Sequence, residues 1–168
     1  RDYKVTGVQT CALPICNLNA RRDWGHAKDY VEMQWRMLQQ DEPRDYVIAT
    51  GRQLSVREFI EAALAEMGVT LRWQGEAEQE VGIVDTVSGD EELAFAPGDE
   101  IVRVDPSYYR PAEVESLLGD PSKAHAELGW QPTTTLEEMV AEMIAFDLDQ
   151  DRKSTRLNSS HLVISYAV

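Results

Sequence analysis

The fold of this chain is decided by residues 102–130, VRVDPSYYRPAEVESLLGDPSKAHAELGW. An apolar run at residues 101–104 predicts a buried strand, and the prolines after it predict a bend. The segment DPSKA at residues 120–124 then predicts the start of a short helix. Strand, bend and helix in this order favour an α/β fold in which the bend is free to present side chains to a ligand.

Arg110 and Glu113 lie in that bend. Because Arg110 precedes Pro111, its backbone favours an extended conformation and not a helix. Its guanidinium suits a phosphate or a carboxylate, and each charged hydrogen bond contributes about 1.5–3 kcal/mol. The Glu113 carboxylate can accept from the N–H edge of a guanine or from sugar hydroxyls. Alternatively the two side chains pair on the surface, which contributes little to stability. The spacing alone favours neither interpretation.

The segment RPAEVESLLGDPSKAHAELGW at residues 110–130 resembles a known signature. It is similar to the C-terminal part of extended short-chain dehydrogenase/reductase enzymes that act on nucleotide sugars, and within them to the GDP-mannose 4,6-dehydratase family. The resemblance implies that Arg110 and Glu113 contact the GDP part of the substrate. It covers residues 17–151, which correspond to the C-terminal, substrate-gripping portion of the family.

A second segment, RDWGHAKDYV at residues 22–31, also resembles this family. In nucleotide-sugar enzymes an arginine just before Asp-Trp or Asp-Tyr meets the ligand diphosphate, which by position is Arg22, with Arg21 the poorer candidate. The alternative is a basic pair that balances Asp23 and Asp29.

Four residues are therefore predicted to bind the substrate, namely Asn17, Arg22, Arg110 and Glu113. The guanidinium groups of Arg22 and Arg110 are expected to converge on the diphosphate. His26, a single histidine near a helix start, is expected to have a structural role.

The resemblance implies an N-terminal doubly wound sheet that binds NADP, followed by a smaller domain that grips the nucleotide sugar. This chain contains no G-x-G-x-x-G loop and no Tyr-x-x-x-Lys pair. We therefore predict that this chain contains no catalytic and no cofactor-binding residue. Most of the Rossmann domain is expected to be missing, and the fragment alone is expected to be inactive. In the complete enzyme, a lyase, the resemblance implies oxidation of mannose C4 by NADP, loss of water across C5 and C6, and return of the hydride to C6. The product would be GDP-4-keto-6-deoxy-mannose, a precursor of GDP-fucose.

Two alternatives remain open. The chain could belong to another nucleotide-sugar dehydratase or epimerase that uses UDP or dTDP, or it could be a non-catalytic nucleotide-sugar-binding module. Binding of pyrimidine nucleotides distinguishes the first alternative from a GDP enzyme.

Length and charge narrow the function classes. A chain of 168 residues is sized for one domain, and its net charge of −14 argues against nucleic acid or an anionic membrane as main partner. No apolar run reaches the roughly 20 residues that span a bilayer, so a cytoplasmic protein is expected. Separately, the full-length protein is expected to be a homo-oligomer. Cys11 and Cys16 have no His or Cys cluster beside them, so neither a metal site nor a disulfide is predicted.

The two ends differ in character from the middle. Residues 1–16, RDYKVTGVQTCALPIC, and residues 152–168, RKSTRLNSSHLVISYAV, match nothing in the resembling family. Both resemble peptides translated from sequencing-library adapter. We hypothesise that neither flank is native, so that residues 17–151 form the nucleotide-sugar-binding portion; genomic sequence that reads through these segments would refute this.

Hydrophobic periodicity predicts the remaining elements. Residues 27–40 should form an amphipathic helix with Trp35 and Leu38 inward, and residues 45–50 a buried strand. Ser55 and Glu58 form a capping box that begins a helix ending near Gly68. The further elements are an edge strand at 69–73, an acidic hairpin-like insertion at 75–98 with a mobile tip near 89–96, and a final helix at 136–148. The isolated chain is expected to expose an apolar face.

Overall fold

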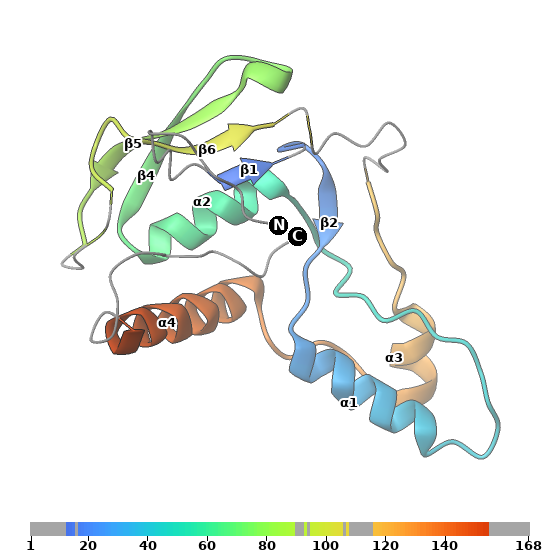
Figure 1. The fold of residues 1–168 in the computed structure, drawn as a ribbon. Helices are drawn as coiled ribbons and strands as arrows, with labels where there is room; N and C mark the ends of the chain where they lie inside the picture. The colour runs from blue at the N-terminus through green and yellow to red at the C-terminus, as the bar shows by residue number, and fades with distance from the viewer. Residues whose placement is uncertain are drawn as a thin grey trace. The chain divides into compact units, whose positions relative to one another are not determined.

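The computed structural model describes residues 13–15, 17–89, 93, 95–105, 107 and 116–154, with only the backbone described at 13, 14 and 151–154. The chain divides into two compact units (Figure 1). The first comprises Arg1–Leu18 and Met67–Glu113, and the second comprises Asn19–Glu66 and Val114–Val168. Chain length predicts a single domain, whereas contacts within the chain separate two.

The first unit is built on a four-stranded sheet with the strand order β1-β6-β5-β4. β1 runs parallel to β6, whereas β5 is antiparallel to both of its neighbours. The elements are β1 (Leu13–Ile15), β4 (Val69–Gln74), the short 3-10 helix η1 (Ala77–Gln79), β5 (Val81–Val87) and β6 (Glu100–Val104).

The position of β5 corrects one prediction. Residues 75–98 were expected to form an insertion, because their acidic residues obscure the apolar alternation. The structure instead places β5 inside the sheet, with the Val84 side chain 1% exposed. Val84 is paired with Leu71 of β4, and Val69 of β4 and Val102 of β6 are buried as well. The predicted edge strand is confirmed as β4, and part of the predicted mobile tip lies outside the described residues.

The described part of the second unit contains a two-stranded antiparallel sheet and four helices; Figure 1 labels these helices. Its elements are β2 (Arg21–Asp23), α1 (Ala27–Leu38), β3 (Gln53–Ser55), α2 (Val56–Glu66), α3 (Ser122–Leu128) and α4 (Leu136–Ser154). Helices and strands thus mix in one chain, which confirms the predicted α/β class.

The helices α2 and α4 pack against each other. Their apolar positions repeat with helical spacing and are buried, as the sequence predicts. The buried side chains are Phe59, Ile60, Ala63 and Leu64 on α2 and Leu136, Met139, Val140 and Ile144 on α4.

A second core joins α1 to α3. Met33, Ala124 and Trp130 are 0%, 0% and 1% exposed, with Tyr30 and Met37 packed against them. The prediction that Trp35 and Leu38 face inward is wrong, because these side chains are 60% and 81% exposed. Helix α1 carries two apolar stripes, and periodicity alone did not show which of them is buried.

The outer stripe of α1 consists of Val31, Trp35 and Leu38. Spacings of four and three residues place these side chains on one face of the helix. The expectation of an exposed apolar face is therefore confirmed.

The segment 45–50 also differs from its prediction. It forms no strand, and of its side chains only Ala49 is buried. Among the described residues, side-chain hydrogen bonds to α3 hold this segment, and no strand pairing does. Lys123 donates from Nζ to the carbonyl of Asp45 at 2.8 Å, and Tyr46 donates to Glu127 at 2.8 Å.

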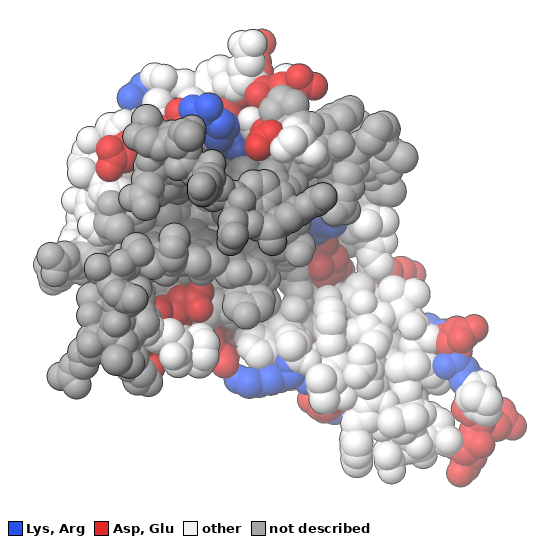
Figure 2. All heavy atoms as spheres, in the orientation of Figure 1, with Lys and Arg blue, Asp and Glu red and all other residues white. Residues whose placement is uncertain are grey.

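Acidic and basic side chains are interspersed on the face of the molecule that Figure 2 shows. In Figure 2 the Lys and Arg atoms form small separate groups among Asp and Glu atoms. No helix within the described ranges combines the length and apolar character that crossing a membrane requires.

Candidate functional site

Arg22 lies in the middle of β2, where it is paired with Leu54 of β3. It donates from Nη1 to the carbonyl of Arg21 at 2.8 Å, so its guanidinium lies along its own strand. Successive side chains of a strand point to opposite faces. Arg21 and Asp23 therefore share one face of β2, and Arg22 occupies the other.

Arg21 has a structural partner. Its Nη2 lies 3.9 Å from the carboxylate of Glu58. Glu58 completes the predicted capping box, because it accepts from the Ser55 backbone N–H at 2.7 Å while Ser55 Oγ accepts from the Glu58 N–H at 3.2 Å. Hydrogen bonds from the backbone and hydroxyl of Ser55 lower the pKa of Glu58. Arg21 thus lies beside the cap of α2, and the choice of Arg22 over Arg21 as the candidate ligand stays a prediction.

Asp23 receives four hydrogen bonds from the loop that leads into β3. Thr50 donates its backbone N–H to both carboxylate oxygens, at 2.9 and 3.1 Å, and its hydroxyl at 2.6 Å. Gly51 donates its backbone N–H at 2.9 Å. A carboxylate offers about four acceptor positions, so the loop saturates Asp23.

The far side of β2 adjoins the segment that follows the predicted bend. Ser116 forms an isolated parallel bridge with Arg21, and Leu117 donates its N–H to the Arg21 carbonyl at 3.3 Å. Ser116 Oγ also accepts from Nε2 of Gln53 at 3.0 Å.

Asp29, 3% exposed, is the buried charged residue of this unit's described part. Its carboxylate accepts from Thr133 Oγ1 at 2.7 Å and from the Thr134 N–H at 3.0 Å, while its carbonyl accepts from Trp130 Nε1 at 3.0 Å. Burial acts to raise the pKa of Asp29, but the hydrogen bonds from Thr133 and Thr134 outweigh it and the pKa is lowered. Asp29 thus ties α1 to the chain between α3 and α4.

The hydrogen-bond partners of Asp23 and Asp29 are relevant to the alternative in which Arg21 and Arg22 only balance the charges of these two acids. Asp23 accepts from the 50–51 loop and Asp29 from residues 133–134. Backbone and hydroxyl donors therefore already bind both carboxylates, which do not require Arg21 or Arg22 as a partner.

His26 has the structural role that the sequence suggests. It is the N-cap of α1, where Nδ1 accepts from the Lys28 N–H at 3.0 Å. Its Nε2 lies 3.4 Å from Glu142 of α4, which also accepts from Lys28 Nζ at 2.7 Å. His26 therefore joins α1 to α4.

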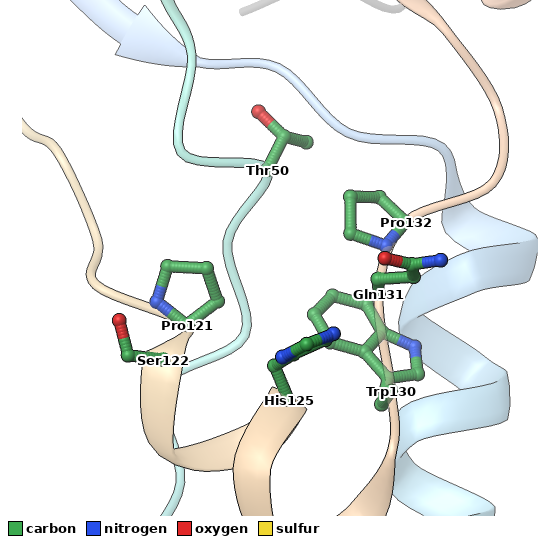
Figure 3. Close-up of a pocket in the computed structure, with 7 residues that line it drawn as sticks. All are labelled: Thr50, Pro121, Ser122, His125, Trp130, Gln131 and Pro132. Atoms are coloured by element: carbon green, nitrogen blue, oxygen red, sulfur yellow. The ribbon is translucent and has the colours of Figure 1, made fainter.

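A hollow of about 440 Å³ opens beside α3 (Figure 3). Its lining is uncharged or weakly basic, and none of the predicted substrate-binding residues is part of it. It is lined by Thr50, Pro121, Ser122, His125, Trp130, Gln131 and Pro132.

The structure tests the predicted site only in part. Arg110 and Glu113 lie outside the described residues, so their convergence with Arg22 stays a prediction. Asn17 is half-buried just before a turn at residues 18–19. The parts of the chain that the structure describes contain no cluster of three metal-ligating side chains. Sequence reasoning missed the Asp23–Thr50 contact, because no local pattern links residues 27 positions apart.

Comparison with known proteins identifies the family. The family model for GDP-mannose 4,6 dehydratase matches residues 5–143. The chain belongs to this family. A GDP-mannose 4,6-dehydratase of Vibrio cholerae is 58% identical over 142 residues, which cover 84% of this chain and 38% of that protein. GDP-mannose 4,6 dehydratase 2 of Caenorhabditis elegans is 54% identical over 145 residues, which cover 86% of this chain and 35% of that protein. The chain thus spans well under half the length of these relatives. The family match begins inside the predicted flank 1–16, whose origin stays a prediction.

Solved structures show the fold. RMD from Pseudomonas aeruginosa, in complex with NADPH, has a TM-score of 0.56 at 19% identity, covering 85% of this chain and 37% of that one. UDP-glucose 4-epimerase from Bifidobacterium longum, in complex with NAD+ and UDP, has a TM-score of 0.58 at 19% identity, covering 83% and 36%. This member of the GDP-mannose 4,6 dehydratase family therefore shares its fold with part of each of these larger proteins.

Proposed function

We propose that this chain is the nucleotide-sugar-binding part of an NADP-dependent GDP-mannose 4,6-dehydratase, which converts GDP-mannose to GDP-4-keto-6-deoxy-mannose. The observation that carries the proposal is the match to relatives of that name at 50–58% identity over most of the chain. A cytoplasmic location and a homo-oligomeric full-length protein are part of the proposal.

Arg22 is the residue through which the described structure supports this role. Strand pairing with β3 fixes its backbone, and the contacts of Arg21 and Asp23 lie on the other face of β2. A guanidinium held on a short strand is suited to a diphosphate, because it donates in a planar fork. Arg110 and Glu113, which lie outside the described residues, belong to the proposed set by resemblance alone. Asn17 completes the proposed set.

No residue of this chain is assigned to the nicotinamide cofactor. The Gly-rich phosphate loop and the Tyr-x-x-x-Lys pair that would hold it and transfer protons do not occur in the sequence. The cofactor supplies the hydride chemistry of such enzymes. The role of the residues proposed here is to bind and orient the nucleotide sugar.

Calorimetric titration of the 168-residue chain with GDP, UDP and dTDP tests the proposal. We expect GDP to bind most tightly. Arg22→Ala should weaken GDP binding by about 1.5–3 kcal/mol, roughly ten- to a hundredfold, and Arg110→Ala should do the same. Arg72→Ala is the matched control, because Arg72 is an exposed arginine of β4 that lies 3.9 Å from Asp85.

Two outcomes would contradict the proposal. Equal or tighter binding of a pyrimidine nucleotide removes the GDP assignment and favours a UDP- or dTDP-sugar enzyme. Absence of nucleotide binding, together with an open reading frame that encodes no upstream Gly-rich strand-turn-helix, removes the dehydratase role. For the complete gene product, conversion of GDP-mannose to the 4-keto-6-deoxy sugar is the direct assay.

A further inference from the structure

We propose that Asp23 is a positioning residue for Arg22: by clamping the 50–51 loop it holds the end of β2, and so sets where the Arg22 guanidinium meets the diphosphate. This inference rests on the proposed function. Asp23 does not itself touch the ligand in this proposal.

The first step concerns the end of β2 at which Asp23 lies. The strand has three residues, and its register with β3 is Arg21 to Ser55, Arg22 to Leu54 and Asp23 to Gln53. So short a ladder has few backbone bonds to resist fraying, and strand ends open first. Asp23 occupies the last position, directly after Arg22.

The second step concerns the strength of the clamp. Two successive backbone N–H groups, those of Thr50 and Gly51, converge on the Asp23 carboxylate together with the Thr50 hydroxyl. Hydrogen bonds to an ionised acceptor are about twice as strong as neutral ones. In Figure 3 the Thr50 oxygen points away from Trp130 and the hollow, which agrees with its use by Asp23.

Gly51 makes this geometry possible. Its φ of +77° lies in the left-handed region, and no atom lies within 4 Å of where a Cβ would be. A turn with this backbone can aim consecutive N–H groups at one anion. The Asp23 carboxylate is that anion, so the loop and the strand end are fixed together.

The third step concerns the faces of β2 to which the Asp23 and Arg22 side chains point. Because Asp23 and Arg22 point to opposite faces of β2, Asp23 acts through the backbone. Loss of the clamp should therefore alter the position of the guanidinium, while leaving its charge unchanged. The effect should be confined to the phosphate part of the ligand.

Titration of the chain with GDP and with guanosine tests this inference, using Asp23→Ala, Thr50→Val and the double variant Arg22→Ala/Asp23→Ala. We expect Asp23→Ala to weaken GDP binding about tenfold, one lost charged contact, while guanosine binding changes less than about twofold. Thr50→Val keeps the carboxylate and the backbone donors, so its loss should be smaller. The double variant should bind GDP no more weakly than Arg22→Ala alone.

Asp41→Ala is the control for removal of an exposed aspartate, and far-UV circular dichroism checks that each variant folds. Parallel weakening of GDP and guanosine would show a purely structural role and overturn the inference, as would additive losses in the double variant. If the wild-type chain binds no GDP, the proposed function fails as well. If it binds GDP and the Asp23 and Thr50 variants bind it equally well, this inference alone fails.

Discussion

Replacement of Asp29 by alanine should destabilise the second unit more than any exposed acidic substitution does. Asp29 is 3% exposed and receives hydrogen bonds from Thr133 Oγ1 and the Thr134 N–H. Its replacement leaves both donors without their acceptor, and it opens space between α1 and the chain that leads into α4.

The magnitude follows from these contacts. A hydrogen bond to a charged group contributes about 1.5–3 kcal/mol, and a buried donor left unpaired costs about 1–3 kcal/mol. Thr133 is exposed and Thr134 is half-buried, so water can reach both donors once the carboxylate is gone. We therefore add no penalty for an unpaired donor and take the lower value, about 1.5 kcal/mol, for each of the two hydrogen bonds. The expected loss for Asp29→Ala is about 3 kcal/mol. Asp29→Asn keeps one acceptor oxygen and should lose about half of that, roughly 1.5 kcal/mol.

Urea unfolding followed by circular dichroism at constant pH measures both losses. Asp41→Ala is the control, since a surface substitution usually changes the free energy of unfolding by less than about 0.5 kcal/mol. A loss for Asp29→Ala no larger than that of the control would refute the reasoning, because it would mean that the buried carboxylate and its donors gain nothing over water.

Four further outcomes are expected from the described contacts. Ser55→Ala removes the cap of α2 and should cost about 1 kcal/mol of unfolding free energy in urea titration. The pKa of Glu58 is lower in the folded state, so its contribution is present above its unfolded pKa and is lost as pH falls through the folded one; Glu58→Gln should make the urea midpoint less sensitive to acidification below about pH 4. Met33→Ala empties a fully buried site and should cost about 2–5 kcal/mol. Trp35→Gln should change stability by less than about 0.5 kcal/mol while lowering binding of the dye ANS, and unchanged dye binding would show that the α1 stripe is not its site.

Local sequence signals predicted the elements that depend on local chemistry. The capping box of Ser55 and Glu58, the core stripe of α4 and the strand before the bend all form as expected. The capping box is made by residues three positions apart. The α4 stripe and the strand pack against distant elements, but the spacing of their own apolar residues is enough to recognise them.

The errors arise where distant residues decide the outcome. Helix α1 has two apolar stripes, and only the position of Trp130 shows that Met33 faces the core while Trp35 faces outward. The segment 45–50 is β-prone but has no strand partner among the described residues. Conversely, β5 is acidic at its flanks yet lies between two strands that bury Val84.

The candidate site shows the same division. The position of Arg22 beside Asp-Trp singled it out by resemblance, but the sequence did not show why Arg21 and Asp23 differ from it. The structure supplies the reason: the two flanking residues carry opposite charges and share one face, where Arg21 meets the cap of α2 and Asp23 meets the loop before β3.

The three side chains of β2 point to two faces of the strand, as strand geometry requires. A side chain at the middle position points away from the face that its two neighbours use. The neighbours contact α2 and the 50–51 loop, so the strand position that carries Arg22 is held by contacts on the opposite face. In a chain of net charge −14, an anionic ligand is repelled at long range, and a basic group must therefore act at short range and in a fixed direction. The proposed placement of Arg22 by Asp23 would meet that requirement, and on this proposal the GDP and guanosine affinities of the Asp23 variants should separate.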